Sequence, residues 1–286
     1  MERAKVNGVE LEYDVAGSGE PLLLISPMVA GAFLPFMAAP ELTSRCRLIR
    51  YHRRGWAGST HTATKARIED HAADAAALLD RLGIARAHVA GHSSGGVIGL
   101  QLAVARPDLV HTVTLLEPTI MGVPAAASLF ERAAPSLEAY QRGEHELAVV
   151  GFLSLVSGLD RETCRRVIDA NVPGGVAQAI RDADTVFGNE LPSLGAWEFG
   201  AEEAAAITQP MLSVVGADTG QLWVEVAALL REWFPQLEEL VVDGVGHLLQ
   251  MQSAAPVVTG VAEFLGRHAM VTAAGGARVA GGGAGR

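Results

Sequence analysis

One short segment has the residue pattern of a reactive serine. Gly91-His92-Ser93-Ser94-Gly95 matches G-x-S-x-G and lies between a predicted strand, Ala87–Ala90, and a predicted apolar helix, Val97–Ala105. This order matters, because a sharp strand-to-helix turn exposes the central serine and needs small neighbours where the chains approach. The free N–H groups at the start of the helix would face the negative charge that develops on a carbonyl under attack. Ser93 is therefore our candidate nucleophile.

A serine hydroxyl needs a base to take its proton, and His247 has the most suitable setting for that role. It follows a predicted strand, Leu237–Val242, and the turn Asp243-Gly244-Val245-Gly246. A histidine in such a loop can approach a serine that ends another strand of the same sheet. Ser93 and His247 therefore form the predicted nucleophile–base pair.

The elements around these residues alternate between strands and helices. Such alternation predicts a mostly parallel sheet with helices on both faces. The strand-like segments are Val9–Val15, Pro21–Ile25, Leu48–Tyr51, Ala87–Ala90, Val110–Leu116, Met211–Val215 and Leu237–Val242, and the helical ones outside 119–207 are Ile68–Leu82, Val97–Ala105, Leu222–Trp233 and Pro256–His268. Between Thr119 and Ile207 the patterns are helical: Ala125–Arg142, Glu144–Ser157 and Arg161–Ala170. We predict an α/β core of residues 1–118 and 208–271, a helical cap of 119–207, and a disordered Gly- and Ala-rich tail of 272–286.

Together these features resemble an α/β-hydrolase fold protein of the capped serine-hydrolase type. The shared features are the block Leu22–Val29, the loop Arg53–Ser59, the turn at Ser93, the helical insertion after Leu116, and Gly244–His247. They extend over residues 6–267, which is nearly all of the chain. The resemblance implies the α/β-hydrolase fold, a mostly parallel sheet flanked by helices with a helical cap insertion. It also implies a catalytic triad in the chain order serine, acid, histidine.

The resemblance leaves two candidates for the triad acid, which would fix the imidazole tautomer and stabilise its positive charge. Asp218 lies near the usual family position, one residue earlier than the commoner G-x-x-D spacing. Glu117 follows the strand after the Ser93 helix, at the sheet end where α/β proteins place their sites. Lactonases that open the macrocyclic ester of zearalenone resemble this chain in carrying a glutamate there and in their Ser-Ser-Gly turn. We favour Glu117 and keep Asp218 as the alternative.

An oxyanion hole needs two N–H donors directed at the developing negative charge. Ser94, the residue after the nucleophile, would supply one from its backbone. In the family the second donor comes from the loop after the early buried strand, which here reads Ser26-Pro27-Met28-Val29. Pro27 has no N–H group, so we expect Met28 to be the donor, with Val29 as the second choice.

Apolar side chains in the loops and in the insertion are expected to line a substrate pocket. The candidates for substrate contact are Trp197, Met121, Phe33 and Leu248, with Trp197 the first choice. A pocket of this kind, with few polar groups, suits a hydrophobic ester or lactone.

Composition excludes several other classes of protein. The 286 residues carry a formal net charge of −10 and have no dense basic patch, so sequence-independent binding to nucleic acid is not expected. The sequence has no secretory h-region and no apolar run of the roughly 20 residues that a membrane span needs, so we expect no membrane partner and a cytoplasmic protein. Histidine and acidic residues lack metal-ligand spacing, and no dinucleotide-binding motif follows a strand. We therefore expect neither a metal nor another cofactor.

The sequence thus predicts a serine hydrolase that cleaves a hydrophobic carboxylic ester or lactone through an acyl-enzyme. The expected partner is a small hydrophobic substrate, and the protein is expected to be a monomer or a homodimer. The alternatives are a C–C bond hydrolase, a cofactor-free oxygenase or lyase on the same fold, and a slow-turnover ligand receptor.

Overall fold

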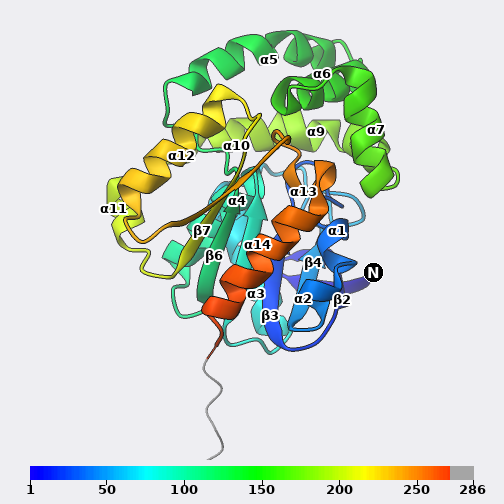
Figure 1. Cartoon of the computed structure of the whole chain (residues 1–286). Helices are drawn as coiled ribbons and strands as arrows, with labels where there is room; N and C mark the ends of the chain where they lie inside the picture. The colour runs from blue at the N-terminus through cyan, green and yellow to red at the C-terminus, as the bar shows by residue number, and fades with distance from the viewer. Residues whose placement is uncertain (271–286) are drawn as a thin grey trace, which may run out of the picture.

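The computed structural model describes residues 1–270, and in them an eight-stranded sheet is covered by helices (Figure 1). The predicted tail, 272–286, lies outside the described residues. The strand order is β1-β2-β4-β3-β5-β6-β7-β8, in which β1, β2 and β4 pair antiparallel and all later neighbours pair parallel. The strands are β1 (Glu2–Val6), β2 (Val9–Ala16), β3 (Glu20–Ile25), β4 (Cys46–Tyr51), β5 (Ala87–His92), β6 (Val110–Leu116), β7 (Met211–Gly216) and β8 (Glu238–Val242). The predicted α/β-hydrolase fold is confirmed.

Strand β1 was not predicted, and its composition explains why. Its sequence, Glu2-Arg3-Ala4-Lys5-Val6, buries two small apolar side chains and exposes three charged ones. Charged side chains of this kind protect the edge of a sheet, so the segment resembles a polar terminus more than a strand.

The central strands are buried on both faces, as parallel strands between two helical layers must be. On β3, Leu22 and Leu24 pack into one hydrophobic core, and Leu23 and Ile25 pack into the other. Helices α3 (Ile68–Arg81), α4 (Ser94–Ala105) and α12 (Gln221–Trp233) cover one face. The other face is covered by α1 (Leu34–Met37), α2 (Pro40–Thr43) and α14 (Ala254–Arg267), and the short α13 (Leu249–Gln252) precedes α14.

A long helical insertion separates β6 from β7. Figure 1 shows most of its helices gathered over one end of the sheet, while the last of them lies beside α12. It consists of α5 (Ala125–Gln141), α6 (His145–Ser157), α7 (Arg161–Asn171), α8 (Gly175–Arg181), α9 (Ala183–Thr185), the π-helix η1 (Val186–Glu190), α10 (Leu191–Ala196) and α11 (Ala201–Ala205). We call these the insertion helices.

Hydrogen bonds attach the insertion helices to the loops that follow β3 and β4. The side chain of Gln178 accepts a hydrogen bond from the Ala30 N–H at 2.9 Å, and the Thr185 hydroxyl donates to the Gly55 carbonyl at 2.6 Å. The Ala30 bond holds the loop that follows β3, which contains the expected oxyanion donors.

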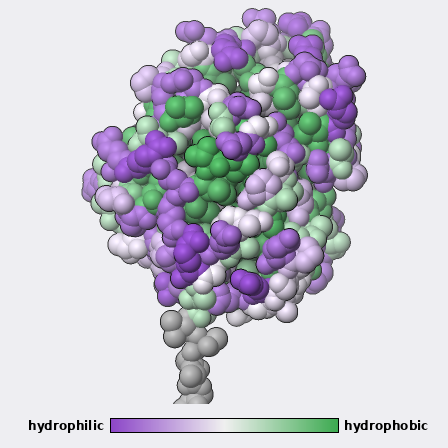
Figure 2. Space-filling view, in the orientation of Figure 1, coloured by the Kyte–Doolittle hydropathy of each residue, from purple (hydrophilic) through white to green (hydrophobic). Residues whose placement is uncertain are grey.

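The visible surface mixes polar and apolar residues. Figure 2 shows hydrophobic side chains gathered near the centre of this face, between α12 and α14, with hydrophilic side chains around them. Within residues 1–270, none of the helices combines the length and the hydrophobicity that crossing a bilayer requires.

Candidate active site

Ser93 stands on a strained turn between β5 and α4. Its backbone has φ 56° and ψ −121°, a conformation that a residue with a side chain rarely adopts. Strain of this kind persists where the surrounding structure enforces it, and it is concentrated at functional sites. Here the Ser93 N–H donates to the Leu116 carbonyl, and the Ser93 carbonyl accepts from the Thr119 N–H, so the turn is tied to the end of β6.

The two glycines of the motif are required by close contacts. A Cβ atom at Gly91 would lie 2.2 Å from the Gly95 carbonyl oxygen, and one at Gly95 would lie 2.0 Å from the Ile25 carbonyl oxygen. Both distances are far shorter than any real Cβ contact. The turn can therefore form only with glycine at both positions, as the sequence pattern predicts.

His247 is paired with Glu117. Its Nδ1 lies 2.7 Å from Glu117 Oε2, and the other carboxylate oxygen accepts the Gly216 N–H at 2.8 Å. Glu117 can reach the imidazole because it directly follows β6, which lies between β5 and β7 in the sheet. The backbone of Glu117 has φ 42°, so Glu117, like Ser93, has a strained conformation.

The alternative acid, Asp218, is not placed to serve this histidine. Its side chain is exposed to solvent, and its N–H is used by the Val245 carbonyl. The residue occupies the turn after β7, a role for which aspartate is well suited. The structure therefore places Glu117, and not Asp218, beside Nδ1 of His247.

Burial shifts the pKa values of both His247 and Glu117. Loss of hydration disfavours the imidazolium and lowers the pKa of His247 well below its ordinary value. Burial also raises the pKa of Glu117, while the hydrogen bond from the Gly216 N–H acts in the opposite direction. A neutral imidazole is the form that can accept a proton from a serine.

His92 is hydrogen-bonded to the backbone of His247. One ring nitrogen, Nε2, lies 2.8 Å from the His247 carbonyl, and the other, Nδ1, lies 3.1 Å from the Gln250 amide nitrogen. Burial lowers the pKa of His92 to about 3. A neutral His92 that accepts from Gln250 must donate through Nε2, which fixes the position of the His247 main chain.

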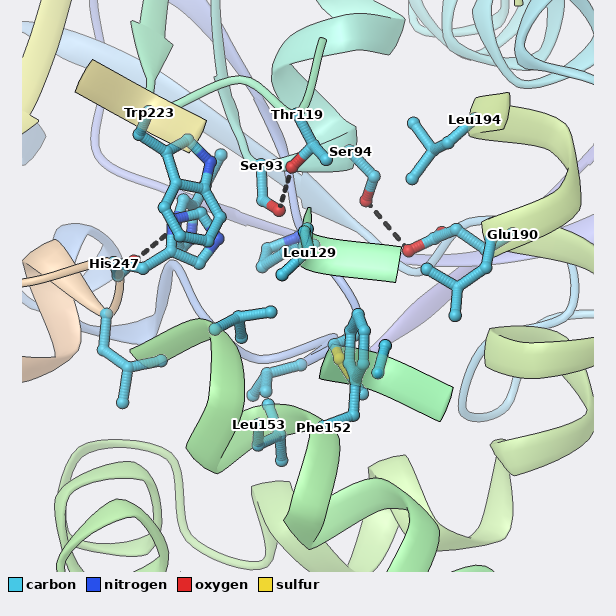
Figure 3. A pocket seen from close by; sticks show the side chains of 18 of the residues that line it. Ser93, Ser94, Thr119, Leu129, Phe152, Leu153, Glu190, Leu194, Trp223 and His247 are labelled. Carbon is cyan, nitrogen blue, oxygen red and sulfur yellow. Dashed lines mark hydrogen bonds between the residues drawn. The ribbon is translucent and has the colours of Figure 1, made fainter. Parts of the chain in front are cut away.

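In this structure the Ser93 hydroxyl is hydrogen-bonded to the Thr119 hydroxyl, 2.8 Å away (Figure 3). Ser93 and His247 line the same cavity. Catalytic hydrogen bonds are often formed only when substrate is present. In this structure the Ser93 side chain is therefore oriented by its hydrogen bond to Thr119.

A cavity that is partly open to solvent lies above these residues and is lined mostly by apolar side chains. The predicted residues Met28, Val29, Met121 and Leu248 line it, as does Ser94. The insertion helices provide much of the remaining wall, through Leu129, Phe130, Ala133, Phe152, Leu153, Val156, Leu191 and Leu194. Within residues 1–270 the Met28 N–H makes no hydrogen bond, and Ser94 is the first residue of α4, so both donors expected for an oxyanion hole are unoccupied.

Two residues expected to contact substrate lie elsewhere. Trp197 follows α10, stacks on Phe199 and donates its indole N–H to the Gln101 side chain at 2.9 Å. Phe33 is fully buried and packs edge-on against Phe36 in the core on the α14 side of the sheet. Both predictions are wrong, because these apolar side chains pack within the fold instead of lining the cavity.

Three other residues of the cavity were not predicted. Trp223 of α12 stacks on the His247 ring, with ring centroids 3.6 Å apart and planes inclined by 19°. Thr119 is hydrogen-bonded to Ser93, and Glu190 accepts a hydrogen bond from the Ser94 hydroxyl at 3.0 Å. In Figure 3, Ser93 lies between the Trp223–His247 pair and Glu190. The proximity of Thr119 to Glu117 in sequence was the one available signal for any of them.

Among residues 1–270, no group of three or more His, Cys, Asp or Glu side chains is arranged to hold a metal ion.

Comparison with known proteins places this site in context. The family model described as alpha/beta hydrolase fold matches residues 21–254. RutD of Azorhizobium caulinodans, assigned by name as a carbamate hydrolase, is 35% identical over 116 residues, which are 41% of this chain and 44% of that protein. The match thus spans less than half the length of this curated relative.

Solved structures match over almost the whole chain. The enol-lactonase from Burkholderia xenovorans LB400 is 23% identical with a TM-score of 0.78, covering 93% of this chain and 100% of that chain. Est816, described as an N-acyl homoserine lactone degrading enzyme, is 25% identical with a TM-score of 0.68, covering 92% and 100%. The first likeness shows the shared fold.

Proposed function

The chain belongs to the alpha/beta hydrolase fold family, and we propose that it is a serine hydrolase that cleaves a hydrophobic carboxylic ester or lactone through an acyl-enzyme. The observation that carries the proposal is the 2.7 Å contact between Glu117 and His247 beside a strained serine in one apolar cavity. A serine, a buried histidine and a carboxylate in this order supply a nucleophile, a base and the group that orients the base.

In the proposed reaction, Ser93 turns from Thr119 toward His247, which takes the proton from Oγ as the oxygen attacks the carbonyl carbon. The negative charge on the carbonyl oxygen is stabilised by the Met28 and Ser94 N–H groups. The imidazolium, stabilised by Glu117, then gives its proton to the leaving alkoxide as the ester bond breaks. Water, deprotonated by His247, attacks the acyl-enzyme in the same way and releases the acid and Ser93.

The substrate class follows from the lining of the cavity and from the relatives. Apolar walls favour hydrophobic acyl or alcohol groups. A lactone is supported by the similarity to Est816, and by the glutamate position and Ser-Ser-Gly turn that resemble the zearalenone-type lactonases. In a lactone the acyl and alcohol groups belong to one molecule, so the product is a hydroxy acid.

The proposal is tested with a panel of hydrophobic esters and lactones of increasing chain length and ring size. We expect saturable release of acid, measured by titration at constant pH, at a rate that does not change when oxygen is removed. A C–C bond hydrolase would instead cleave diketones and leave the esters intact. The reaction of an oxygenase would stop under argon, because oxygen is its co-substrate. Either result from a folded protein would contradict the proposal.

Trp223 provides a prediction about the base. Its ring covers the His247 imidazole, and an aromatic face stabilises a cation, which His247 becomes only in the transition state. We therefore expect Trp223→Leu to lower kcat about tenfold with little change in KM. Trp223→Phe, which keeps an aromatic face, should retain kcat within about threefold.

The matched control is Trp233→Leu, on the same helix. Trp233 lies 5.5 Å from the Phe199 ring and does not line the cavity, so its loss should affect stability and leave kcat unchanged. If Trp223→Leu raised KM and kept kcat, Trp223 would be a wall of the substrate cavity with no effect on the base.

A further inference from the structure

A second polar cluster lines the cavity on the side of Ser93 opposite His247 (Figure 3). Glu190, from η1, accepts a hydrogen bond from the Ser94 hydroxyl at 3.0 Å. Its other oxygen lies 2.5 Å from Nη1 of Arg53, which follows β4, but their alignment does not make a hydrogen bond. Arg53 is in turn held over the face of Trp56, 4.8 Å from the ring centroid.

Burying the Arg53–Glu190 ion pair costs hydration free energy. Arg53 is 2% exposed and Glu190 is 6% exposed, so both charges have lost nearly all of their hydration. A buried ion pair is often replaced by apolar residues without loss of stability, so folding alone does not require one here. Glu190 also ends a π-helix, a rare element that is frequent at functional sites. The reaction proposed above uses neither Arg53 nor Glu190.

The position of Glu190 indicates which part of a substrate it faces. In ester cleavage the histidine must reach the leaving oxygen, so the alcohol part lies on the His247 side of Ser93. The acyl part then extends to the other side, where Glu190 lies among Leu191, Leu194 and other apolar side chains. A carboxylate is an acceptor-only group, with lone pairs beyond the one used by Ser94.

We propose that Glu190 binds a hydrogen-bond donor, a hydroxyl or an N–H group, on the acyl part of the substrate. The preferred substrates are then esters or lactones of hydrophobic acids that carry such a donor. Arg53 compensates the charge of Glu190, and Ser94 orients its carboxylate. This inference rests on the proposed hydrolase function and deepens it.

The test compares ethyl esters of straight-chain ω-hydroxy acids of increasing length with esters in which a methyl group replaces the hydroxyl. At the length that reaches Glu190, the wild-type kcat/KM for the hydroxy ester should exceed that for its methyl partner by about tenfold or more, as expected for a hydrogen bond to a charged group. A ratio near one at every length would overturn the proposal.

Two double variants test whether the preference for the hydroxy ester depends on Glu190. In the double variant Arg53→Met with Glu190→Leu, which leaves no unpaired charge, the ratio should fall to about one or below. The control, Arg142→Met with Glu144→Leu, removes an exposed ion pair of the insertion and should keep the wild-type ratio. A preference that survives in the first double variant would overturn the proposal. If that variant does not fold, Glu190→Gln takes its place. It should lower the kcat/KM ratio of hydroxy ester to methyl ester several-fold, and an unchanged ratio would overturn the proposal.

Binding measurements distinguish a failure of the proposed Glu190 subsite from a failure of the proposed hydrolase function. The same ester pairs are titrated into Ser93→Ala by calorimetry, where no acyl-enzyme can form. Tighter binding of the hydroxy ester supports the subsite even if the wild type hydrolyses neither ester, a result that would count against the hydrolase alone. Equal binding, with both esters hydrolysed, would overturn the subsite and leave the hydrolase standing.

Discussion

Replacing Ser93 with alanine is expected to lower the hydrolysis of esters and lactones by about 10⁴-fold or more, because the covalent route is lost. The variant should still fold, since the turn depends on the two glycines and on backbone bonds of Ser93, which alanine keeps. Rates are measured on the best substrate of the ester and lactone panel, and circular dichroism checks the fold.

A fluorophosphonate, which reacts with activated serines, gives an independent measure of the same prediction. Intact-mass analysis should find one adduct on the wild type, at Ser93, and none on Ser93→Ala. The matched control is Ser213→Ala, which removes the hydroxyl of a fully buried serine on β7 outside the cavity and should keep both rate and adduct. Equal hydrolysis by wild type and Ser93→Ala would exclude the proposed nucleophile.

Much of this site could be predicted because its determinants are local. The strained turn at Ser93 is specified by five consecutive residues, and the contacts at Gly91 and Gly95 show why their sizes cannot change. Glu117 was a candidate because β5 and β6 are neighbouring parallel strands joined by one helix. Their carboxyl ends must therefore lie side by side.

The errors come from tertiary packing that the pattern of apolar residues does not specify. An apolar pattern does not show what Trp197 and Phe33 face. Trp197 is half-buried and bonds to Gln101, and Phe33 packs into the core on the α14 side of the sheet. The stacking of Trp223 depends on how α12 meets the loop after β8. Likewise Glu190 meets Arg53 through a π-helix that hydrophobic periodicity does not reveal.

The second large effect concerns the acid. We expect Glu117→Gln to lower kcat by about 10⁴-fold and Asp218→Asn to change it by less than about threefold. A glutamine amide that donates to His247 Nδ1 leaves the proton on Nε2, and this tautomer cannot accept the proton of Ser93. Asp218 is exposed, so its neutralisation removes no contact with the imidazole. Both variants are measured side by side on the same ester.

Stability distinguishes loss of the base orientation from loss of the fold. Glu117 is 1% exposed and burial raises its pKa, so the neutral amide removes a buried charge while it keeps an oxygen for the Gly216 N–H. Glu117→Gln should therefore unfold at a temperature close to that of the wild type, in spite of its low kcat. If the two variants exchanged their effects, the imidazole would have to pair with Asp218 during turnover. That pairing would have to replace the present contact between Glu117 and His247 Nδ1, since Asp218 is exposed in this structure.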